Sequence, residues 1–140
     1  MGRLLIVSNR LPVTVRRGPD GVSVEHSMGG LATGMKGPHE QLGGLWIGWP
    51  GELEGLDPEA RDDVDRRLAE LRLAPVHLSA DEVARYYEGY SNSALWPVCH
   101  YAIARLPREV KDYDAYEAVN VRFAEAVADR YEPGDLVWVH

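Results

Sequence analysis

The feature that most constrains the fold is a short continuous apolar run at residues 4–7, which ends in the polar Ser8, Asn9 and Arg10. An apolar run without alternation is typical of a strand that is covered on both faces, as in parallel sheets. Ligands of open α/β sheets bind beyond the carboxyl ends of the strands. These three polar residues are therefore the first candidates for a functional site, although they are equally typical of a surface turn before Pro12.

Strand-like and helix-like segments alternate along the rest of the chain. Residues 13–25 predict a β-hairpin around the turn sequence RGPDG. Further buried strands are predicted at 43–51, 74–78 and 136–140. Helices are predicted at about 30–42, at 57–73, from residue 79 onwards and at 108–131. This alternation predicts an α/β fold, a Rossmann-like parallel sheet with flanking helices and a β-hairpin insertion.

Three of the predicted helices have recognisable sequence signals. Pro58 stands in the first turn of the second helix, where its missing N–H costs nothing. Residues 79–82 form the S-x-x-E pattern of a capping box. In the last helix, apolar residues recur at three- and four-residue spacing, namely Tyr116, Val119, Phe123 and Val127.

Composition excludes several classes of protein. The chain has 140 residues, 45% of them hydrophobic, which fits one globular domain. Its single cysteine, Cys99, makes a disulfide scaffold impossible, and no second Cys/His pair at metal-ligand spacing accompanies it. We predict Cys99 to be a small buried apolar residue. No apolar run has the length of a membrane span or a signal peptide, so a soluble, cytoplasmic protein is expected.

Charge is distributed unevenly along the chain. Residues 1–50 carry five basic and three acidic side chains, whereas residues 51–72 carry four and eight and residues 73–140 carry six and eleven. No run of basic residues of the nucleic-acid-binding type is present. An anionic ligand is therefore expected to be small and to be bound by the first third of the chain.

Two further segments have residue types that suit phosphate and sugar ligands. Gly29 and Gly30 precede a predicted helix, whose first N–H groups favour phosphate oxygens, although a glycine pair is often no more than a tight turn. Trp46 and Trp49 lie near the end of the second predicted strand and are able to frame a sugar ring. Packing in the core is the alternative interpretation of these tryptophans.

The segment at residues 86–101 is rich in aromatic residues, five of its sixteen being Tyr or Trp. They are interleaved with Ser91, Asn92 and His100. A carbohydrate site needs this combination, because a sugar has an apolar C–H face and hydroxyl groups that require hydrogen-bond partners. A buried pair of aromatic helices would have a similar composition.

Six blocks of sequence, in order, resemble those of the trehalose-6-phosphate synthases, the retaining glycosyltransferases of family 20. The blocks are LLIVSNRLPV at 4–13, GGLATGM at 29–35, GGLWIGWPG at 43–51, YYEGYSNSALWPVCHY at 86–101, YEAVNVRFAEAVA at 116–128 and GDLVWVH at 134–140. They cover most of the chain apart from the region of residues 52–80, so the match is far more specific than any single motif.

The resemblance implies a GT-B fold, with two Rossmann-like domains that face each other across a cleft. Residues 1–140 are then expected to supply the N-terminal, acceptor-side domain in truncated form, without the C-terminal nucleotide-sugar domain. The implied reaction transfers glucose from UDP-glucose to glucose 6-phosphate with retention of configuration, giving trehalose 6-phosphate. It implies no cofactor and no metal, and no nucleic-acid or membrane partner.

The resemblance also implies roles for individual residues. Arg10 is similar in position to the family's contact with the acceptor phosphate, and a guanidinium fork suits a phosphate. Tyr87 and Trp96 resemble the aromatic contacts to glucose 6-phosphate. Gly29 and Gly30 resemble the loop whose backbone approaches the donor sugar and diphosphate, where N–H groups stabilise developing charge.

Asn9, Trp46 and His140 are expected to be further site-lining residues. The blocks contain no carboxylate pair for a double displacement, so no catalytic residue is assigned within the chain. The family's next acceptor contact is an Asp that directly follows the position of His140. We therefore expect a polypeptide of residues 1–140 to lack transferase activity and to associate through its uncovered apolar surface.

The sequence leaves alternatives open for the function, the substrates and the assembly. The chain could be a non-catalytic homologue that binds a phosphosugar. It could also belong to a relative with another acceptor, such as a glucosylglycerol-phosphate synthase or a cyclitol-coupling pseudo-glycosyltransferase. The donor base could be that of UDP, GDP or ADP, and the parent enzyme could be a monomer or a homo-oligomer.

Overall fold

The computed structural model describes residues 2–19, 21–27 and 29–140 of the chain. They form two compact units. The sheet unit consists of residues 1–77 together with residues 123–140, and the helical unit consists of residues 78–122.

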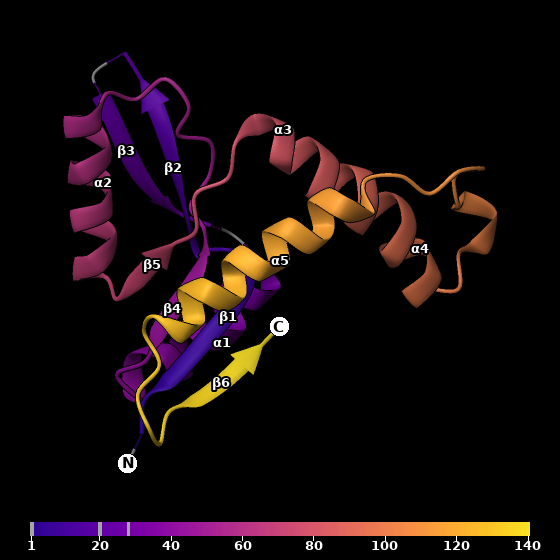
Figure 1. Ribbon diagram of the computed structural model, residues 1–140. Helices are drawn as coiled ribbons and strands as arrows, with labels where there is room; N and C mark the ends of the chain where they lie inside the picture. Colours follow the sequence, from indigo (N-terminus) through magenta and orange to yellow (C-terminus); the bar gives the residue numbers. More distant parts are fainter. Residues whose placement is uncertain (1, 20, 28) are drawn as a thin grey trace. The chain divides into compact units, whose positions relative to one another are not determined.

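A four-stranded parallel sheet is the centre of the sheet unit (Figure 1). Its strands lie in the order β5-β4-β1-β6, with the bounds β1 Leu4–Arg10, β4 Leu45–Trp49, β5 Leu73–Pro75 and β6 Leu136–Val139. Leu5 pairs with Leu45 on one side and with Val137 on the other, so β1 is a central strand. The predicted α/β class and the parallel sheet are confirmed.

The first strand is buried as its composition predicts. Every residue from Leu4 to Ser8 is buried, and exposure increases only at Asn9 and Arg10. Leu4 and Ile6 pack in the core with Trp46 of β4, together with Val64 and Leu68 of helix α2 (Pro58–Glu70). A strand enclosed in this way has no polar face, which explains its uninterrupted apolar sequence.

A β-hairpin lies beside the sheet, as predicted. Its strands are β2 (Val13–Gly18) and β3 (Gly21–His26), paired antiparallel with Val15 opposite Val24. Gly21 has φ +113°, a conformation that side chains disfavour, and this explains a glycine after the turn. The Val15 N–H donates to the Pro50 carbonyl at 2.9 Å and so joins the hairpin to the segment that follows β4.

Two helices of the sheet unit begin at the predicted signals. Helix α1 (Gly30–Gln41) has Gly29 as its N-cap. Helix α2 begins with Pro58 in its first turn, and the Asp57 side chain accepts a hydrogen bond from the Ala60 N–H at 2.8 Å. The N–H groups of a first turn have no partner within the helix, so a capping carboxylate stabilises the start.

The helical unit begins at the predicted capping box. The Ser79 side chain accepts from the Glu82 N–H, and the Glu82 carboxylate accepts from the Ser79 N–H at 2.9 Å. Helix α3 (Ala80–Glu82) continues directly into η1 (Val83–Leu95), which has π-helical hydrogen bonds, and then into α4 (Trp96–Cys99). A short 3-10 turn, η2 (Ile103–Arg105), follows.

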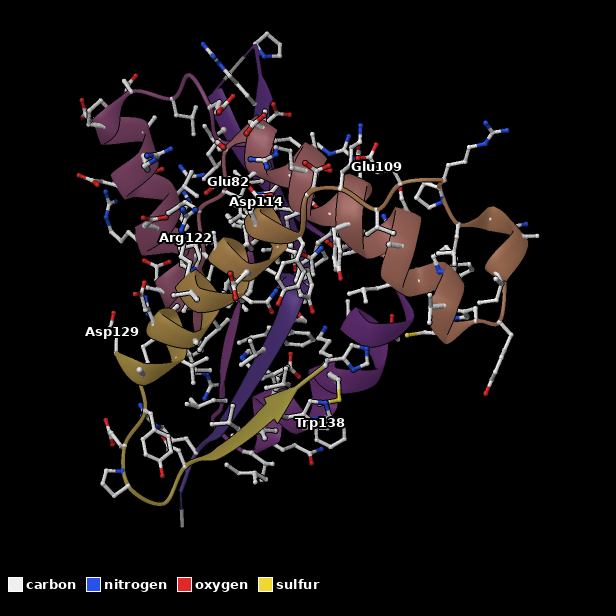
Figure 2. All side chains as sticks on the ribbon, turned by 45° about the vertical axis from the view of Figure 1, so that its right-hand side comes forward. Glu82, Glu109, Asp114, Arg122, Asp129 and Trp138 are labelled. Atoms are coloured by element: carbon white, nitrogen blue, oxygen red, sulfur yellow. The ribbon has the colours of Figure 1, made fainter. Side chains whose placement is uncertain are left out.

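The last helix, α5 (Tyr113–Ala128), is shorter than the predicted 108–131. Asp112 directly before it has φ +66°, which is incompatible with a continuous helix. Arg85 holds this start, because its guanidinium donates to Asp112 at 2.9 Å and to Asp114 at 2.7 Å. Within the same unit, Arg122 of α5 donates to Glu82 at 2.9 Å, and Figure 2 shows these two side chains together.

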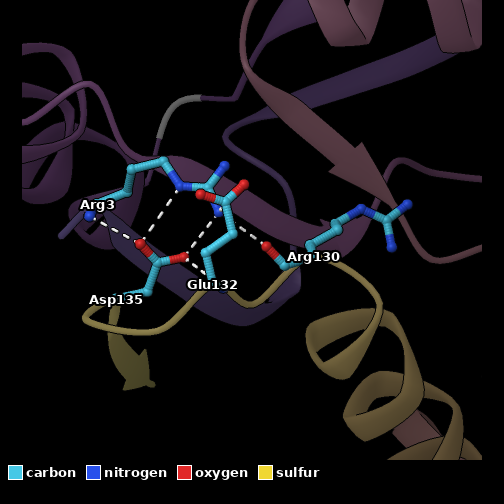
Figure 3. A network of polar contacts seen from close by, with 4 residues as sticks. All are labelled: Arg3, Arg130, Glu132 and Asp135. Carbon is cyan, nitrogen blue, oxygen red and sulfur yellow. Dashed lines mark hydrogen bonds and ion pairs between the residues drawn. The ribbon is translucent and has the colours of Figure 1, made fainter.

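A polar network joins the start of β1 to the turn before β6 (Figure 3). The Arg3 guanidinium donates to Asp135 at 2.7 Å and to the Arg130 carbonyl at 2.9 Å, and it lies 3.3 Å from Glu132. Asp135 also accepts from the Arg3 backbone N–H at 2.9 Å. Hydrogen bonds from Arg3 lower the pKa of Asp135 to about 2. The network aligns β6 with β1.

Candidate active site

The carboxyl ends of β1 and β6 lie next to each other at the point where the direction of the sheet reverses. The chain passes from β1 to β4 and β5 on one side, and then returns to place β6 on the other side of β1. The His140 N–H donates to the Val7 carbonyl at 2.8 Å, so His140 lies beside the end of β1. Ligands of doubly wound sheets bind at such a switch point. Asn9, Arg10 and His140 are therefore at the edge of the sheet where a ligand is expected.

A pocket of about 520 Å³ opens beyond the end of β1. Three of the residues predicted for the site line it, namely Arg10, Gly29 and Trp46. The remaining lining residues come from the hairpin and its neighbours: Leu11, Pro12, Thr14, Arg16, Glu25, His26, Ser27 and Ala32. The fold thus brings a predicted acceptor contact and a predicted donor contact to one cavity, although they are separated by about twenty residues in sequence.

Basic and hydroxyl side chains dominate the polar part of this pocket. Arg10 is exposed there, and Arg16 lies 3.5 Å from the Glu25 carboxylate, which offsets its charge. The hydroxyls of Thr14 and Ser27 lie 2.9 Å apart. An arginine fork with neighbouring hydroxyl donors suits a small phosphorylated ligand.

Gly29 and Gly30 stand where the pocket meets the start of α1. Gly29 is extended, with φ −145° and ψ 153°, and its carbonyl accepts from the Thr33 N–H at 2.9 Å. A Cβ atom built on either glycine would meet no heavy atom within 4 Å among the described residues. The backbone is therefore accessible at this turn, as an approach by a ligand requires.

Trp46 forms the floor of the pocket rather than an exposed wall. Its side chain is only 1% exposed, and its Nε1–H donates to the Ser8 hydroxyl at 2.8 Å. Ser8 in turn donates to the Arg10 carbonyl at 2.6 Å. Trp46 is thus a core residue that supports the end of β1 and also lines the pocket.

A second pocket, of about 450 Å³, adjoins the first and shares Trp46 as a lining residue. It includes His39, a buried residue of α1 that the sequence analysis did not single out. The His39 Nε2–H donates to the Arg72 carbonyl at 3.2 Å, and the imidazole meets Trp46 edge to face at 5.7 Å. Burial lowers the pKa of His39. No motif around His39 predicts this burial, which depends on contacts with residues distant in sequence.

Tyr87 and Trp96 lie in the helical unit, whereas Arg10 lies in the sheet unit. Tyr87 is half-buried in η1, and Trp96, at the start of α4, is 47% exposed. The Trp96 N–H donates to the Ser91 carbonyl five residues earlier. Hydrogen bonds that span five residues wind η1 more widely than an α-helix of about 3.6 residues per turn, so its side chains are distributed differently around the helix axis.

Tyr86, next to Tyr87, belongs to a cluster of tyrosines inside the helical unit. Its ring stacks on Tyr116 at 6.0 Å, and Tyr90 lies 4.7 Å from Tyr116. Burial raises the pKa of Tyr86 to about 12. The cluster therefore holds η1 against the start of α5.

Cys99 is exposed, so the prediction that it is buried is wrong. It stands in the last turn of the short helix α4, where neighbouring elements do not cover it. Among the described residues, no group of three or more His, Cys, Asp and Glu side chains is arranged to hold a metal ion. No helix in the described part of the chain has the length and apolarity required to cross a membrane.

Comparison with known protein families decides the classification. The family model of glycosyltransferase family 20 matches residues 2–140. The chain belongs to this family. Family 20 membership accounts for the six sequence blocks and for the α/β fold, which is that of the corresponding part of the GT-B trehalose-6-phosphate synthases.

Individual family 20 members resemble the chain closely. An α,α-trehalose-phosphate synthase (UDP-forming) of Aspergillus niger is 45% identical over 99% of this chain and 29% of its own length. The crystal structure of an α,α-trehalose-phosphate synthase (UDP-forming) from Burkholderia vietnamiensis has a TM-score of 0.69 and 32% identity, covering 100% of this chain and 27% of that one. A Burkholderia xenovorans enzyme of the same name, in complex with glucose 6-phosphate, has a TM-score of 0.63 and 29% identity over 99% of this chain and 28% of its own. The chain therefore spans less than a third of the length of these relatives.

Proposed function

We propose that this chain is part of a UDP-forming trehalose-6-phosphate synthase, in which it binds the glucose 6-phosphate acceptor and contributes to the donor site. The observation that supports this most strongly is the pocket beyond β1, which Arg10 and Gly29 line together. The family, the UDP-forming relatives and the relative in complex with glucose 6-phosphate support the same reaction.

In this proposal Arg10 binds the phosphate of glucose 6-phosphate. Its exposed guanidinium stands at the carboxyl end of β1, and hydroxyl donors line the same cavity. Each hydrogen bond between charged partners contributes about 1.5–3 kcal/mol. Tyr87 and Trp96 bind the apolar face of the acceptor ring, and Asn9 and His140 line the site.

Gly29 and Gly30 approach the donor in the same proposal. Their backbone, together with the first turn of α1, presents N–H groups to the diphosphate of UDP-glucose. Developing negative charge on the leaving diphosphate is stabilised there, and the acceptor is held in position. No side chain of this chain is assigned a covalent role, and the reaction requires no cofactor or metal in this proposal. The cytoplasmic location stays a prediction from the sequence.

The test is an assay of the full-length protein that contains this sequence. Release of UDP should require both UDP-glucose and glucose 6-phosphate, and the product should be trehalose 6-phosphate by mass spectrometry. Arg10→Ala should raise the KM for glucose 6-phosphate roughly 10- to 100-fold, the equivalent of about one charged hydrogen bond. Arg17→Ala is the matched control, because Arg17 is an exposed arginine near the hairpin tip that does not line the pocket.

Other outcomes would contradict the proposal in different ways. Binding of glucose 6-phosphate in calorimetry without any transfer would favour the non-catalytic phosphosugar-binding homologue. Transfer to a different acceptor would favour a relative such as a glucosylglycerol-phosphate synthase. An unchanged KM in Arg10→Ala would remove the assigned phosphate contact.

A further inference from the structure

The backbone of Arg10 is held by neighbouring side chains of the sheet unit. The Ser8 hydroxyl donates to the Arg10 carbonyl at 2.6 Å and accepts from the Trp46 Nε1–H at 2.8 Å. The Leu11 N–H donates to the Trp49 carbonyl at 2.9 Å. These bonds fix the end of β1 at the place where its register with β4 shifts.

The side chain of Arg10 is held by a different residue. Its Cζ atom lies 4.8 Å from the centroid of the Trp49 ring. A guanidinium at this distance over an indole is attracted to the negative face of the ring. Arg10 and Trp49 are also register partners on adjacent strands, so the contact joins the two strand ends.

Trp49 is suited to this role by its burial. The residue is 7% exposed, so the surrounding core determines the orientation of its ring. Its Nε1 atom is buried and has no hydrogen-bond partner within residues 2–19, 21–27 and 29–140. The polar group of Trp49 therefore does not hold the ring in place, and the surface that it offers to Arg10 is the face of its π system.

We propose that Trp49 is a positioning residue for the acceptor phosphate, which acts by holding the Arg10 guanidinium at the mouth of the pocket. The inference rests on the proposed function, in which Arg10 binds that phosphate. A guanidinium has five N–H donors, so contact with a ring leaves it able to form a two-pronged bond with a phosphate. Arginine loses considerable rotamer freedom when it is ordered, and ordering by Trp49 before the ligand arrives reduces the cost of binding.

A double-mutant cycle on the full-length protein tests the proposal. Trp49→Leu should raise the KM for glucose 6-phosphate about three- to tenfold and change kcat less than about twofold, because the lost attraction acts on binding. Trp49→Phe, which keeps an aromatic face and removes the unpaired N–H, should restore the KM to within about twofold of the wild-type value. In the Arg10→Ala background, Trp49→Leu should have no further effect. Tyr131→Leu, at a half-exposed aromatic residue outside the pocket, is the matched control.

Two results would overturn the proposal, and together they distinguish its own failure from failure of the proposed function. If Trp49→Leu raises the KM equally with and without Arg10, Trp49 does not act through Arg10. If Arg10→Ala leaves the KM unchanged, the phosphate contact itself is wrong.

If Trp49→Leu does not fold, a second measurement tests the proposal. Tryptophan analogues with increasing numbers of ring fluorines, placed at position 49, keep the shape of the ring but weaken its negative face. The KM for glucose 6-phosphate should rise with each added fluorine. A KM that is independent of fluorination would exclude the attraction between Arg10 and Trp49.

Discussion

The imidazole of His100 stacks on the indole of Trp96, with ring centroids 3.9 Å apart and planes inclined by 16°. The His100 Nδ1–H also donates to the Trp96 carbonyl at 2.8 Å, which fixes the stacked position. One face of Trp96 is thereby covered by the residue that caps its helix, and Trp96 is still 47% exposed. The part of the ring that is left accessible is the surface on which the proposed sugar contact depends.

Substitutions of this pair should affect acceptor binding to different degrees. Trp96→Ala should raise the KM for glucose 6-phosphate about tenfold, as expected for loss of an aromatic contact. His100→Ala should raise it about two- to threefold, because the indole loses only its support. Steady-state kinetics of the full-length protein measure both effects, with Val98→Ala in the same short helix as the control. A larger effect of His100→Ala than of Trp96→Ala would contradict this order of roles.

Ser8→Ala should destabilise the fold by about 1–3 kcal/mol, because the buried Nε1–H of Trp46 loses its acceptor. Urea denaturation followed by tryptophan fluorescence measures the change. Ser23→Ala, at an exposed serine of the hairpin, should change stability by less than about 0.5 kcal/mol. Equal stabilities of the two variants would show that the Ser8 hydroxyl does not matter to the core.

Gly48→Ala should be strongly destabilising. A Cβ atom there would lie 2.9 Å from both the Ser8 carbonyl oxygen and the Leu11 nitrogen, so the backbone that carries Arg10 would have to move. Gly34→Ala in α1 is the matched control, since its Cβ would meet nothing within 4 Å among the described residues and alanine favours a helix by about 0.5–1 kcal/mol. Thermal melts should shift down for the first variant and up for the second. A melting temperature unchanged by Gly48→Ala would be inconsistent with the close approach of β4 to β1.

The Arg3–Asp135 contact should make stability depend on acidic pH. The pKa of Asp135 is lowered from 3.8 to about 2, chiefly by the hydrogen bond from Arg3. The unfolded state therefore takes up a proton first, and the contribution of Asp135 is complete above about pH 4 and is lost as the pH falls towards 2. Asp135→Asn should reduce the loss of unfolding free energy across this range. Identical acid profiles for wild type and Asp135→Asn would exclude this linkage.

His39 should add a second pH dependence near neutrality. Burial lowers its pKa below 6.5. The hydrogen bond to the Arg72 carbonyl and the charge of Glu40 act in the opposite direction, and the charge of Arg72 acts in the same direction as burial. The unfolded state then binds the proton more readily, so stability is complete above about pH 6.5 and falls as the pH decreases below it. His39→Gln keeps a donor for the Arg72 carbonyl and should flatten the melting temperature between about pH 7.5 and 5.5. A melting temperature of His39→Gln that depends on pH as in the wild type would contradict this linkage.

Several local features of the fold could be predicted from the sequence because short-range interactions produce them. The turn sequence placed the hairpin correctly, and Pro58 and the Ser79–Glu82 capping box marked helix starts within one residue. The apolar run of β1 identified a doubly covered strand. The predicted end of this strand also identified Arg10 as a candidate site residue, because a strand that leaves the core ends in polar residues.

Other features of the candidate site required the tertiary structure. The length of α5 was overestimated, since the salt bridges of Arg85 to Asp112 and Asp114 come from an element far away in sequence. Cys99 was predicted to be buried, but it lies in a helix too short to be covered by neighbouring elements. His39 was missed, because its burial depends on the Arg72 carbonyl and on Trp46.

The sequence by itself determined the strands, the hairpin, the helix caps and the family, because each depends on neighbouring residues or on motifs in order. The tertiary structure alone decided that β6 returns beside β1, that Trp49 lies under the Arg10 guanidinium, and that η1 has π-helical hydrogen bonds. The last of these, hydrogen bonds that span five residues rather than four, is a change in winding that periodicity does not reveal. The site therefore depends on contacts between segments that are distant in the chain, and such contacts form only when the core is complete.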